Sequence, residues 1–212
     1  DNTFATALVQ RPLELGATLS LTSTTKYING HSDALGGAVC TNDPEWHQKM
    51  VFSQKALGLQ PSPFDCWLIT RGIKTLPLRL KQQMANAAAL SDLLADHPKV
   101  NWVRYPQRTD HPQHAVAAKQ MKAGGAIVTV SFDANQEQTY ALCKQLQWFT
   151  MAESLGGIES LICHPATMTH AAVAADVKKK LGIDDGLVRF SVGCEDLTDL
   201  QADLHQALEL LT

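Results

Sequence analysis

The sequence lacks three features that would assign it to a broad class: a long hydrophobic run, paired cysteines and an excess of one charge. Its apolar stretches are too short and too often interrupted to span a membrane, and no signal peptide is visible. The five cysteines are scattered, odd in number and form no C-x-x-C motif. This pattern is typical of buried thiols in a reducing compartment, not of a disulfide framework or a zinc site. We therefore expect a cytoplasmic protein without a membrane partner.

The charges are few and nearly balanced. Lysine and arginine number 18 and aspartate and glutamate 21, which gives a net charge of −3 at pH 7. That balance argues against a protein that binds nucleic acid or another polyanion. The densest basic run, residues 178–180, is followed by Asp184 and Asp185, and we interpret it as a solvated helix end. With 212 residues, 45% of them hydrophobic, the chain can form one large domain or one and a half.

The hydrophobic pattern changes near residue 97. Before that point, strand-like pieces and tight turns precede helical stretches, of which the last is long and rich in strong helix formers. After it, short strands alternate with helices, as in a compact α+β unit. The pattern predicts strands at residues 1–4, 15–22, 35–41, 100–106, 126–133, 148–154 and 187–193, and helices at 44–57, 78–94, 114–121, 136–146 and 197–211.

We divide the chain accordingly into two parts. Residues 1–97 form the α/β part, which includes the long connecting helix, and residues 98–212 form a smaller α+β domain. The strands of residues 1–41 are expected to belong to a larger parallel sheet, because parallel strands need neighbours and covering helices on both faces.

The stretch S-T-T-K-Y-I-N-G-H-S-D, residues 23–33, places a lysine directly after a β-prone run. Lys26 should therefore lie on the loop that leaves a strand, where ligands bind in α/β proteins. A lysine there could neutralise a phosphate or form a Schiff base with a carbonyl cofactor. The phosphate-loop signature G-x-x-x-x-G-K-[ST] is absent. Taken alone, Lys26 would be interpreted as a surface lysine on a turn.

The lysine has neighbours that suit a cofactor. Asp1 and Thr3 lie one strand upstream, and a carboxylate at a strand end is what a protonated pyridine nitrogen needs. The hydroxyls of Ser23 and Thr25, two residues apart on an extended segment, could both donate to a phosphate. Arg189 lies inside an apolar strand, where it must be paired with a carboxylate, either from the protein or from a substrate.

Several motifs resemble those of the Cys/Met metabolism pyridoxal-phosphate (PLP) enzymes, which include cystathionine γ-lyase and cystathionine γ-synthase. They are D-N-T-F…Q-R-P-L-E-L-G-A…S-T-T-K-Y-I-N-G-H-S-D…G-G, P-S-P-F-D-C-W-L-I-T-R-G-I-K-T-L, E-S-L-G-G-I-E-S-L-I-C-H-P-A-T-M-T-H and R-F-S-V-G-C-E-D. The resemblance covers essentially the whole chain and implies a fold-type I PLP enzyme. By position it implies the following roles: Lys26 is catalytic and binds PLP as a Schiff base, Asp1 holds the ring nitrogen, Thr3 lies beside the ring, Ser23 and Thr25 bind the phosphate, and Ser154, Arg189 and Glu153 bind the substrate.

The chain departs from this family in length. Family members are nearly twice as long, and their N-terminal half supplies a Gly-rich phosphate loop, an aromatic ring stacked on the cofactor and an arm that reaches the neighbouring subunit. None of these is present in the sequence. We interpret the chain as the C-terminal part of such an enzyme, with the N-terminal half as its missing partner and a dimer of dimers as its assembly. Ala7 replaces the family's usual proline in a turn, with little consequence for the chemistry.

The resemblance implies transsulfuration at Cγ of a sulfur-containing amino acid. Glu153, before S-L-G-G, is similar to the residue found in cystathionine-handling members. We favour cystathionine γ-lyase, with cystathionine γ-synthase acting on an acylated homoserine as the alternative. A second alternative, from another class, is a cofactor-free and non-catalytic fragment.

Some other residues invite a functional interpretation that we do not adopt. His164 and His170 could be metal ligands, but the proline between them breaks the helix that would align them, and we expect structural roles. His31 and Asp33 are expected to brace the loop that carries Lys26. Cys66 is expected to lie in the core.

Overall fold

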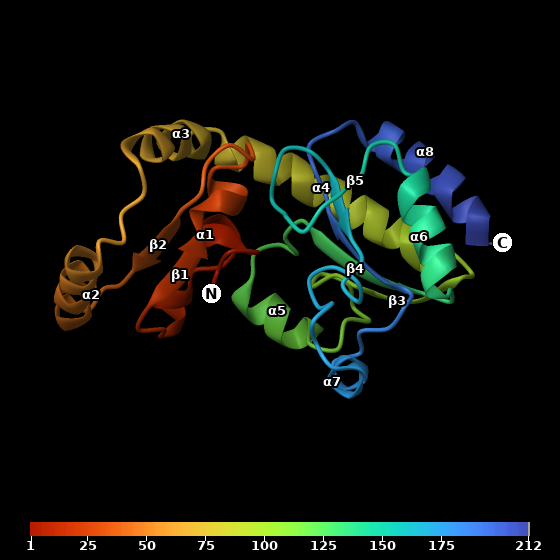
Figure 1. Ribbon diagram of the computed structural model, residues 1–212, viewed down its shortest axis with the longest axis horizontal. Helices are drawn as coiled ribbons and strands as arrows, with labels where there is room; N and C mark the ends of the chain where they lie inside the picture. The colour runs from red at the N-terminus through yellow and green to blue at the C-terminus, as the bar shows by residue number, and fades with distance from the viewer. Residues whose placement is uncertain (212) are drawn as a thin grey trace.

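The computed structural model describes residues 1–211, and in it a long helix, α4, runs from a two-stranded sheet to a five-stranded one (Figure 1). The α-helices are α1 Thr6–Val9, α2 Pro44–Leu57, α3 Pro63–Ile73, α4 Leu76–Ala95, α5 His114–Gln120, α6 Gln136–Gln145, α7 Ala175–Lys180 and α8 Leu197–Leu208. The strands are β1 Ser20–Ser23, β2 Gly37–Cys40, β3 Val100–Arg104, β4 Ile127–Phe132, β5 Thr150–Met151, β6 Leu161–Cys163 and β7 Leu187–Ser191. The short helical turns are η1 Pro12–Leu15, η2 Thr24–Ile28 and η3 Glu209–Leu211.

Local sequence explains where several helices begin. Asp43, Ser62 and Asp196 cap α2, α3 and α8, each by accepting a backbone N–H with its side chain. Proline takes the first helical position of α2 and α3, where its missing N–H costs nothing. Asn135 and Gln138 form a reciprocal capping box at α6. These signals account for helices near the predicted ranges.

The five-stranded sheet has the order β3-β4-β7-β6-β5 and is antiparallel except for the pair β5–β6. Strand β7 lies between β4 and β6, and Arg189 at its centre is opposite Thr129 and Cys163. Side chains alternate along a strand. Val188 and Phe190 are buried in the core, so Arg189 points to the other face of the sheet.

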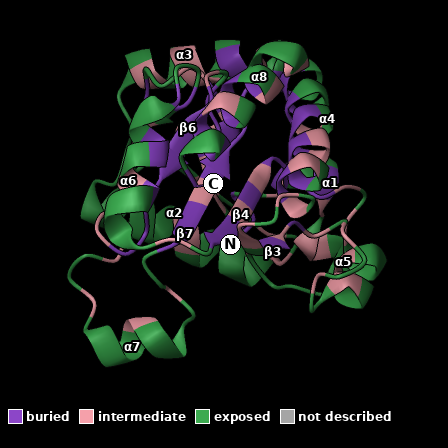
Figure 2. Cartoon of the chain, turned by 90° about the vertical axis from the view of Figure 1, so that its right-hand side faces the viewer, coloured by how far each residue is buried: buried purple, intermediate pink, exposed green. Residues whose placement is uncertain are grey.

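Helices α4, α6 and α8 pack beside this sheet and close one hydrophobic core with it (Figures 1 and 2). Because α4 shares that core, the chain's two parts are joined by packing as well as by sequence. The boundary at residues 97 and 98 remains a prediction. The core's largest aliphatic contributors include Leu80, Leu90, Leu94, Leu142, Ile162, Leu200 and Leu204.

The two-stranded sheet differs from the expected arrangement. Strands β1 and β2 pair antiparallel, with Ser20 opposite Cys40 and Ser23 opposite Gly37. The expected parallel direction is therefore wrong for this pair, and membership of a larger sheet remains a prediction. The physical reason is the connection, which turns back through η2 and makes no crossover of the kind that parallel strands require.

Helices α2 and α3 and the β1–β2 pair leave many apolar side chains exposed. Cys66 on α3 is exposed with them, so the expectation that it lies in the core is wrong. Apolar side chains of α3 face outward, and the local sequence alone does not show whether an apolar helix face points outward or into the core. The exposed large hydrophobic residues of this region are Leu19, Leu21, Leu35, Val39, Trp46, Val51, Phe52, Leu57, Leu59, Phe64, Trp67 and Ile73.

Some strand predictions were also wrong in extent. Residues 1–4 form no strand, since residues 3–5 form a turn. The run 15–22 contributes only the beginning of β1, because a 3₁₀ turn ending at Gly16 (φ +94°) precedes it. The run 148–154 contains only β5, and the short strand β6 was not predicted. None of the helices described within residues 1–211 is both long and apolar enough to cross a membrane.

Candidate active site

A cavity of about 710 Å³ lies between the turn that carries Lys26 and the loop that carries Ser154. The two segments are 128 residues apart in sequence, and they meet on the side of the molecule to which Arg189 points. The residues that line the cavity are Thr25, Lys26, Ser32, Asp33, Ala34, Leu35, Asp65, Ala152, Ser154, Glu159 and Leu161.

Lys26 lies directly after β1, as the sequence predicted. It falls inside the π-helical turn η2, whose regular geometry it interrupts with φ −88° and ψ −127°. Its Nζ donates a hydrogen bond to Ser154 Oγ at 3.1 Å. Burial lowers the pKa of Lys26, and the positive charge of Arg189 lowers it further. This environment favours the neutral, nucleophilic amine.

Hydrogen bonds from the neighbouring segments hold the Lys26 turn. Thr25 Oγ accepts the N–H of Gly36 at 3.0 Å, and the N–H of Ser23 donates to Thr3 Oγ at 2.9 Å. The Asp1 carboxylate in turn accepts the N–H of Thr3 at 2.8 Å. The predicted cofactor-binding residues before and after β1 are thus linked, although Asp1 lines a separate cavity of about 540 Å³.

Arg189 contacts the same site from β7. Its Nη2 donates to the backbone oxygen of Ser154 at 3.0 Å, whereas its Nε is buried without a hydrogen-bond partner. Among the ion pairs of residues 1–211, none joins Arg189 to a carboxylate. Of the two partners that the sequence left open, the geometry favours a carboxylate from a ligand, because a buried guanidinium N–H without a partner is costly.

The structure does not bring every predicted residue to this cavity. Glu153 is exposed and is absent from the lining. Glu159 lines the cavity instead, and its carboxylate accepts a hydrogen bond from Ser32 Oγ. Sequence reasoning missed Glu159, although it follows the same S-L-G-G motif that drew attention to Glu153.

The expected braces of the Lys26 loop are present. Asn29 Nδ2 donates to Asp33 Oδ1 at 2.8 Å, and a ring nitrogen of His31 hydrogen bonds with the backbone oxygen of Asn29 at 2.7 Å. His164 is buried, and its two ring nitrogens contact Thr167 Oγ and the backbone oxygen of Asp185. Both histidines therefore have the structural roles that we expected.

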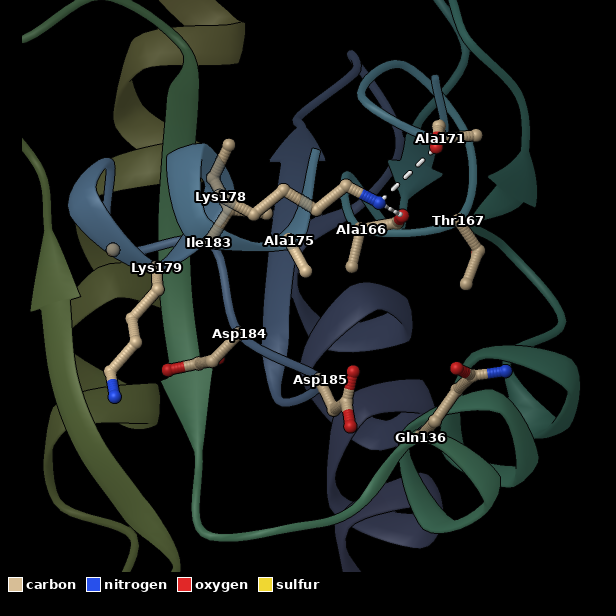
Figure 3. A pocket seen from close by; sticks show the side chains of 11 residues that line it. Gln136, Ala166, Thr167, Ala171, Ala175, Lys178, Lys179, Ile183, Asp184 and Asp185 are labelled. Carbon is tan, nitrogen blue, oxygen red and sulfur yellow. Dashed lines mark hydrogen bonds between the residues drawn. The ribbon is translucent and has the colours of Figure 1, made fainter. Parts of the chain in front are cut away.

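A larger cavity, of about 850 Å³, lies elsewhere and contains none of the predicted site residues (Figure 3). Lys178 crosses it and donates to the backbone oxygens of Ala166 and Ala171 at 2.9 and 3.3 Å. This lysine fastens α7 to the loop before it, so the solvated helix end predicted for residues 178–180 is only partly solvated.

The residues in and around the Lys26 cavity fit a PLP cofactor. An accessible lysine with a lowered pKa can bond to an aldehyde carbon. Thr3 Oγ accepts the bond from Ser23, so its own O–H can still donate to a ligand. The unpartnered Nε of Arg189 suits an amino-acid carboxylate.

Comparisons with known proteins agree with this chemistry. The family of Cys/Met metabolism PLP-dependent enzymes matches residues 1–209. The chain is 50% identical over 208 residues to cystathionine gamma-synthase of Mycobacterium tuberculosis (98% of this chain, 53% of the relative) and 47% identical over 209 residues to cystathionine gamma-lyase of Dictyostelium discoideum (99% and 54%). It is 47% identical over 209 residues to cystathionine beta-lyase of Coxiella burnetii (98% and 54%).

A solved structure supports the same relationship. Cystathionine gamma synthase from Xanthomonas oryzae pv. oryzae, in complex with aminoacrylate and cysteine, superposes with a TM-score of 0.96 at 49% identity, over 99% of this chain and 54% of that one. The chain spans about half the length of the relatives it matches, so its mixed α/β structure corresponds to about half of a fold-type I PLP enzyme. On this evidence the chain belongs to the Cys/Met metabolism PLP-dependent enzyme family.

Proposed function

We propose that the chain is the C-terminal part of a PLP-dependent transsulfuration enzyme that acts at Cγ of a sulfur-containing amino acid. The observation that carries the proposal is the meeting of Lys26, Ser154 and Arg189 from three distant segments. An amino acid held by the guanidinium would be presented to the lysine amine. PLP, when bound, supplies the electron sink that makes loss of a Cα proton feasible.

Arg189 and Ser154 are the proposed carboxylate site. Nη2 of Arg189 already donates to the Ser154 backbone oxygen, and this bond fixes the plane of the guanidinium. Its buried Nε would then donate to one carboxylate oxygen, and Ser154 Oγ, which accepts the bond from Lys26, keeps its own O–H to donate to the other. This grip orients the substrate's Cα–H bond, and such orientation is a large part of catalysis.

Lys26 is the proposed base. Its lowered pKa favours the neutral amine, which would remove the Cα proton and, after handing that proton to bound PLP, would remove a second proton from Cβ. The electron pair of the Cβ–H bond then forms a Cβ–Cγ double bond as the Cγ–S bond breaks, and the lysine ammonium returns its proton to the departing thiolate. Lys26 is the only one of the three side chains that carries an amine able to bond to an aldehyde, so it serves both steps.

Asp1, Thr3, Ser23 and Thr25 are the proposed cofactor contacts. The carboxylate of Asp1 would hold the cofactor's ring nitrogen in its protonated form, and the hydroxyls would contact the ring and the phosphate. The hydrogen bonds that join Asp1 to Thr3 and Thr3 to Ser23 support this assignment, because they link three of the four residues, and Thr25 follows Ser23 by two residues.

Cystathionine γ-lyase is the activity we favour. The synthase is the second candidate, and the relative that is 50% identical favours it. An assay of the full-length enzyme separates them: a γ-lyase converts L-cystathionine and water into cysteine, 2-oxobutanoate and ammonia, whereas the synthase joins cysteine to an acylated homoserine. Release of homocysteine and pyruvate would instead indicate a β-lyase.

Borohydride reduction tests the cofactor directly. A violet-absorbing preparation in which reduction fixes the cofactor on Lys26 supports the proposal. A colourless preparation in which peptide mapping finds Lys26 unmodified would favour the cofactor-free fragment.

The proposed partners are an amino-acid substrate, the N-terminal half and further copies of the enzyme. The exposed apolar side chains of α2, α3, β1 and β2 support a protein partner for this region. Size-exclusion light scattering of the full-length enzyme should give a tetramer, arranged as a dimer of dimers. The isolated 23.1 kDa chain should be unstable or aggregate, and tight PLP binding by a stable monomer of that mass would contradict the assignment. We keep a cytoplasmic location as a prediction.

A further inference from the structure

Helix α4 carries a buried polar stripe, which we define as Arg79, Gln83 and Asn86. The three residues are 7, 0 and 1% exposed. Their spacing of four and three residues places them on one face of the helix. Buried polar groups need partners, and each member of the stripe finds its partners on a different segment of the active site.

Arg79 holds the turn that carries Lys26. Its Nη1 donates to the backbone oxygen of Tyr27 at 2.9 Å and its Nη2 to that of Ile28 at 3.3 Å, directly after Lys26. The fit is close, because a Cβ on Gly30 would lie 2.1 Å from Nη1. Within residues 1–211 no carboxylate pairs with Arg79 in an ion pair, and its other hydrogen bonds go to Thr75 Oγ and the backbone oxygen of Gly72.

Gln83 holds the loop that carries Ser154. Its Nε2 donates to the backbone oxygen of Gly157 at 2.6 Å, three residues after Ser154. The same loop is tied to the Lys26 loop, because the N–H of Ile158 donates to the backbone oxygen of Gly30 at 3.0 Å. A shift of the Gln83 side chain would therefore move both the loop that carries Ser154 and the loop that follows Lys26.

Asn86 holds the end of the strand that carries Arg189. Its Nδ2 donates to the backbone oxygens of Gly193 and Glu195 at 3.1 and 2.9 Å, just beyond β7. Gln82 fixes the orientation of the amide by donating to Asn86 Oδ1 at 2.9 Å. The amide hydrogens of Asn86 are thus committed to one segment.

We propose that this stripe positions the three active-site side chains relative to one another. One rigid helix contacts the backbone one residue after Lys26, three residues after Ser154 and four residues after Arg189, so it sets distances that no single loop could set. The inference rests on the proposed function, since it assigns these three side chains to one reaction. The members of the stripe are positioning residues, because they act through backbone groups and touch no reacting atom.

Gln83→Met tests the central contact. Methionine has a similar length but cannot donate to Gly157, and it removes an amide oxygen that has no hydrogen-bond partner, so the cost to stability is limited. In the full-length enzyme we expect kcat/KM for L-cystathionine to fall about tenfold or more, mainly through KM, because misplacement by a fraction of an ångström is costly.

Thr139→Val is the matched control. Thr139 on α6 is also buried, and its Oγ donates to the backbone oxygen of Asn135 at 2.8 Å; neither residue lines the Lys26 cavity. Both variants should lower the melting temperature by a few degrees, but Thr139→Val should keep full kcat/KM. If Gln83→Met also keeps full kcat/KM, its role is structural and the inference is overturned.

Two further measurements do not depend on turnover. Amide hydrogen exchange at Ile158 should be faster in Gln83→Met than in Thr139→Val, and equal protection would contradict the inference. L-Norleucine, an amino acid without a leaving group, should bind Gln83→Met more weakly than wild type by calorimetry, and equal affinity would overturn the inference. If wild type binds L-norleucine but turns over none of the proposed substrates, the proposed function fails while these two measurements still decide the role of the stripe.

Arg79→Lys tests the contact to the lysine turn. Lysine keeps the positive charge but can reach only one of the carbonyls that Arg79 contacts. We expect the pH midpoint of the visible absorbance of the lysine–cofactor linkage to shift, because the direction of Lys26 is no longer fixed. An unchanged midpoint would exclude Arg79 from the positioning role.

Discussion

Replacing Arg189 with lysine separates the charge of this residue from its shape. Arg189→Lys keeps a positive charge on β7 but loses the planar fork of N–H donors. In the structure that fork makes one bond to the Ser154 backbone oxygen and holds Nε buried without a partner. The ammonium of lysine can satisfy one of these directions but cannot hold a carboxylate in the same plane.

The size of the effect follows from the number of bonds lost. A hydrogen bond to a charged group contributes about 1.5–3 kcal/mol. Loss of one such bond to the substrate carboxylate should therefore lower kcat/KM by about 10- to 150-fold, since about 1.4 kcal/mol is a factor of ten. The loss should fall on both parameters, because weaker binding raises KM and a misaligned Cα–H lowers kcat.

Steady-state kinetics of the full-length enzyme with L-cystathionine measure this loss. Arg108→Lys is the control, since Arg108 is also a partly buried arginine but pairs with Asp92 and Asp110, outside both the Lys26 cavity and the cavity that Asp1 lines. Its kinetics should match those of the wild type. Unchanged kcat/KM in Arg189→Lys would refute the reasoning and would mean that Arg189 serves a partner within the protein.

Three other changes have defined outcomes. Lys26→Ala should abolish turnover and leave the far-UV circular dichroism unchanged, and any retained catalysis would remove Lys26 from the mechanism. Arg189→Gln should raise the pKa of Lys26, because the substitution removes a positive charge that lowers this pKa. The pH midpoint for labelling of Lys26 by an amine-reactive reagent should therefore move upward. An unchanged midpoint would show that the charge of Arg189 does not lower the pKa of Lys26. Gly156→Ala should lower the free energy of unfolding by about 1–3 kcal/mol in chemical denaturation, since Gly156 has φ +79° and a Cβ there would lie 2.8 Å from Tyr27 N. Gly182→Ala is the control and should lower the free energy of unfolding less, because Gly182 has φ +70° but open space around it. Equal destabilisation by the two variants would mean that the close contact at Gly156 has no effect.

Local patterns were enough to predict the elements that carry the chemistry. The apolar residues on either side of Arg189 predicted a strand, β7, with a cation inside it. The β-prone run before Lys26 predicted that this lysine lies at the end of a strand. Caps and prolines marked α2 and α3. These signals depend on neighbours within a few residues, so a sequence displays them directly.

Long-range placement could not be predicted in the same way. The contact between Lys26 and Ser154 joins residues 128 positions apart, and nothing in either segment specifies the distance. The polar stripe of α4 was missed because arginine, glutamine and asparagine on a long helix usually face solvent. The antiparallel β1–β2 pair was missed because strand direction depends on the path of the connection.

The polar stripe of α4 also constrains how this protein can evolve. Each residue of an α-helix turns the chain by about 100°. A single inserted residue between Arg79 and Gln83 would swing the later members of the stripe away from their backbone partners, and a deletion would do the same in the opposite sense. The loop around α7, whose helix is exposed and only six residues long, has no such register to keep. Natural length variation in relatives of this chain should therefore gather near α7 and be absent between residues 79 and 86.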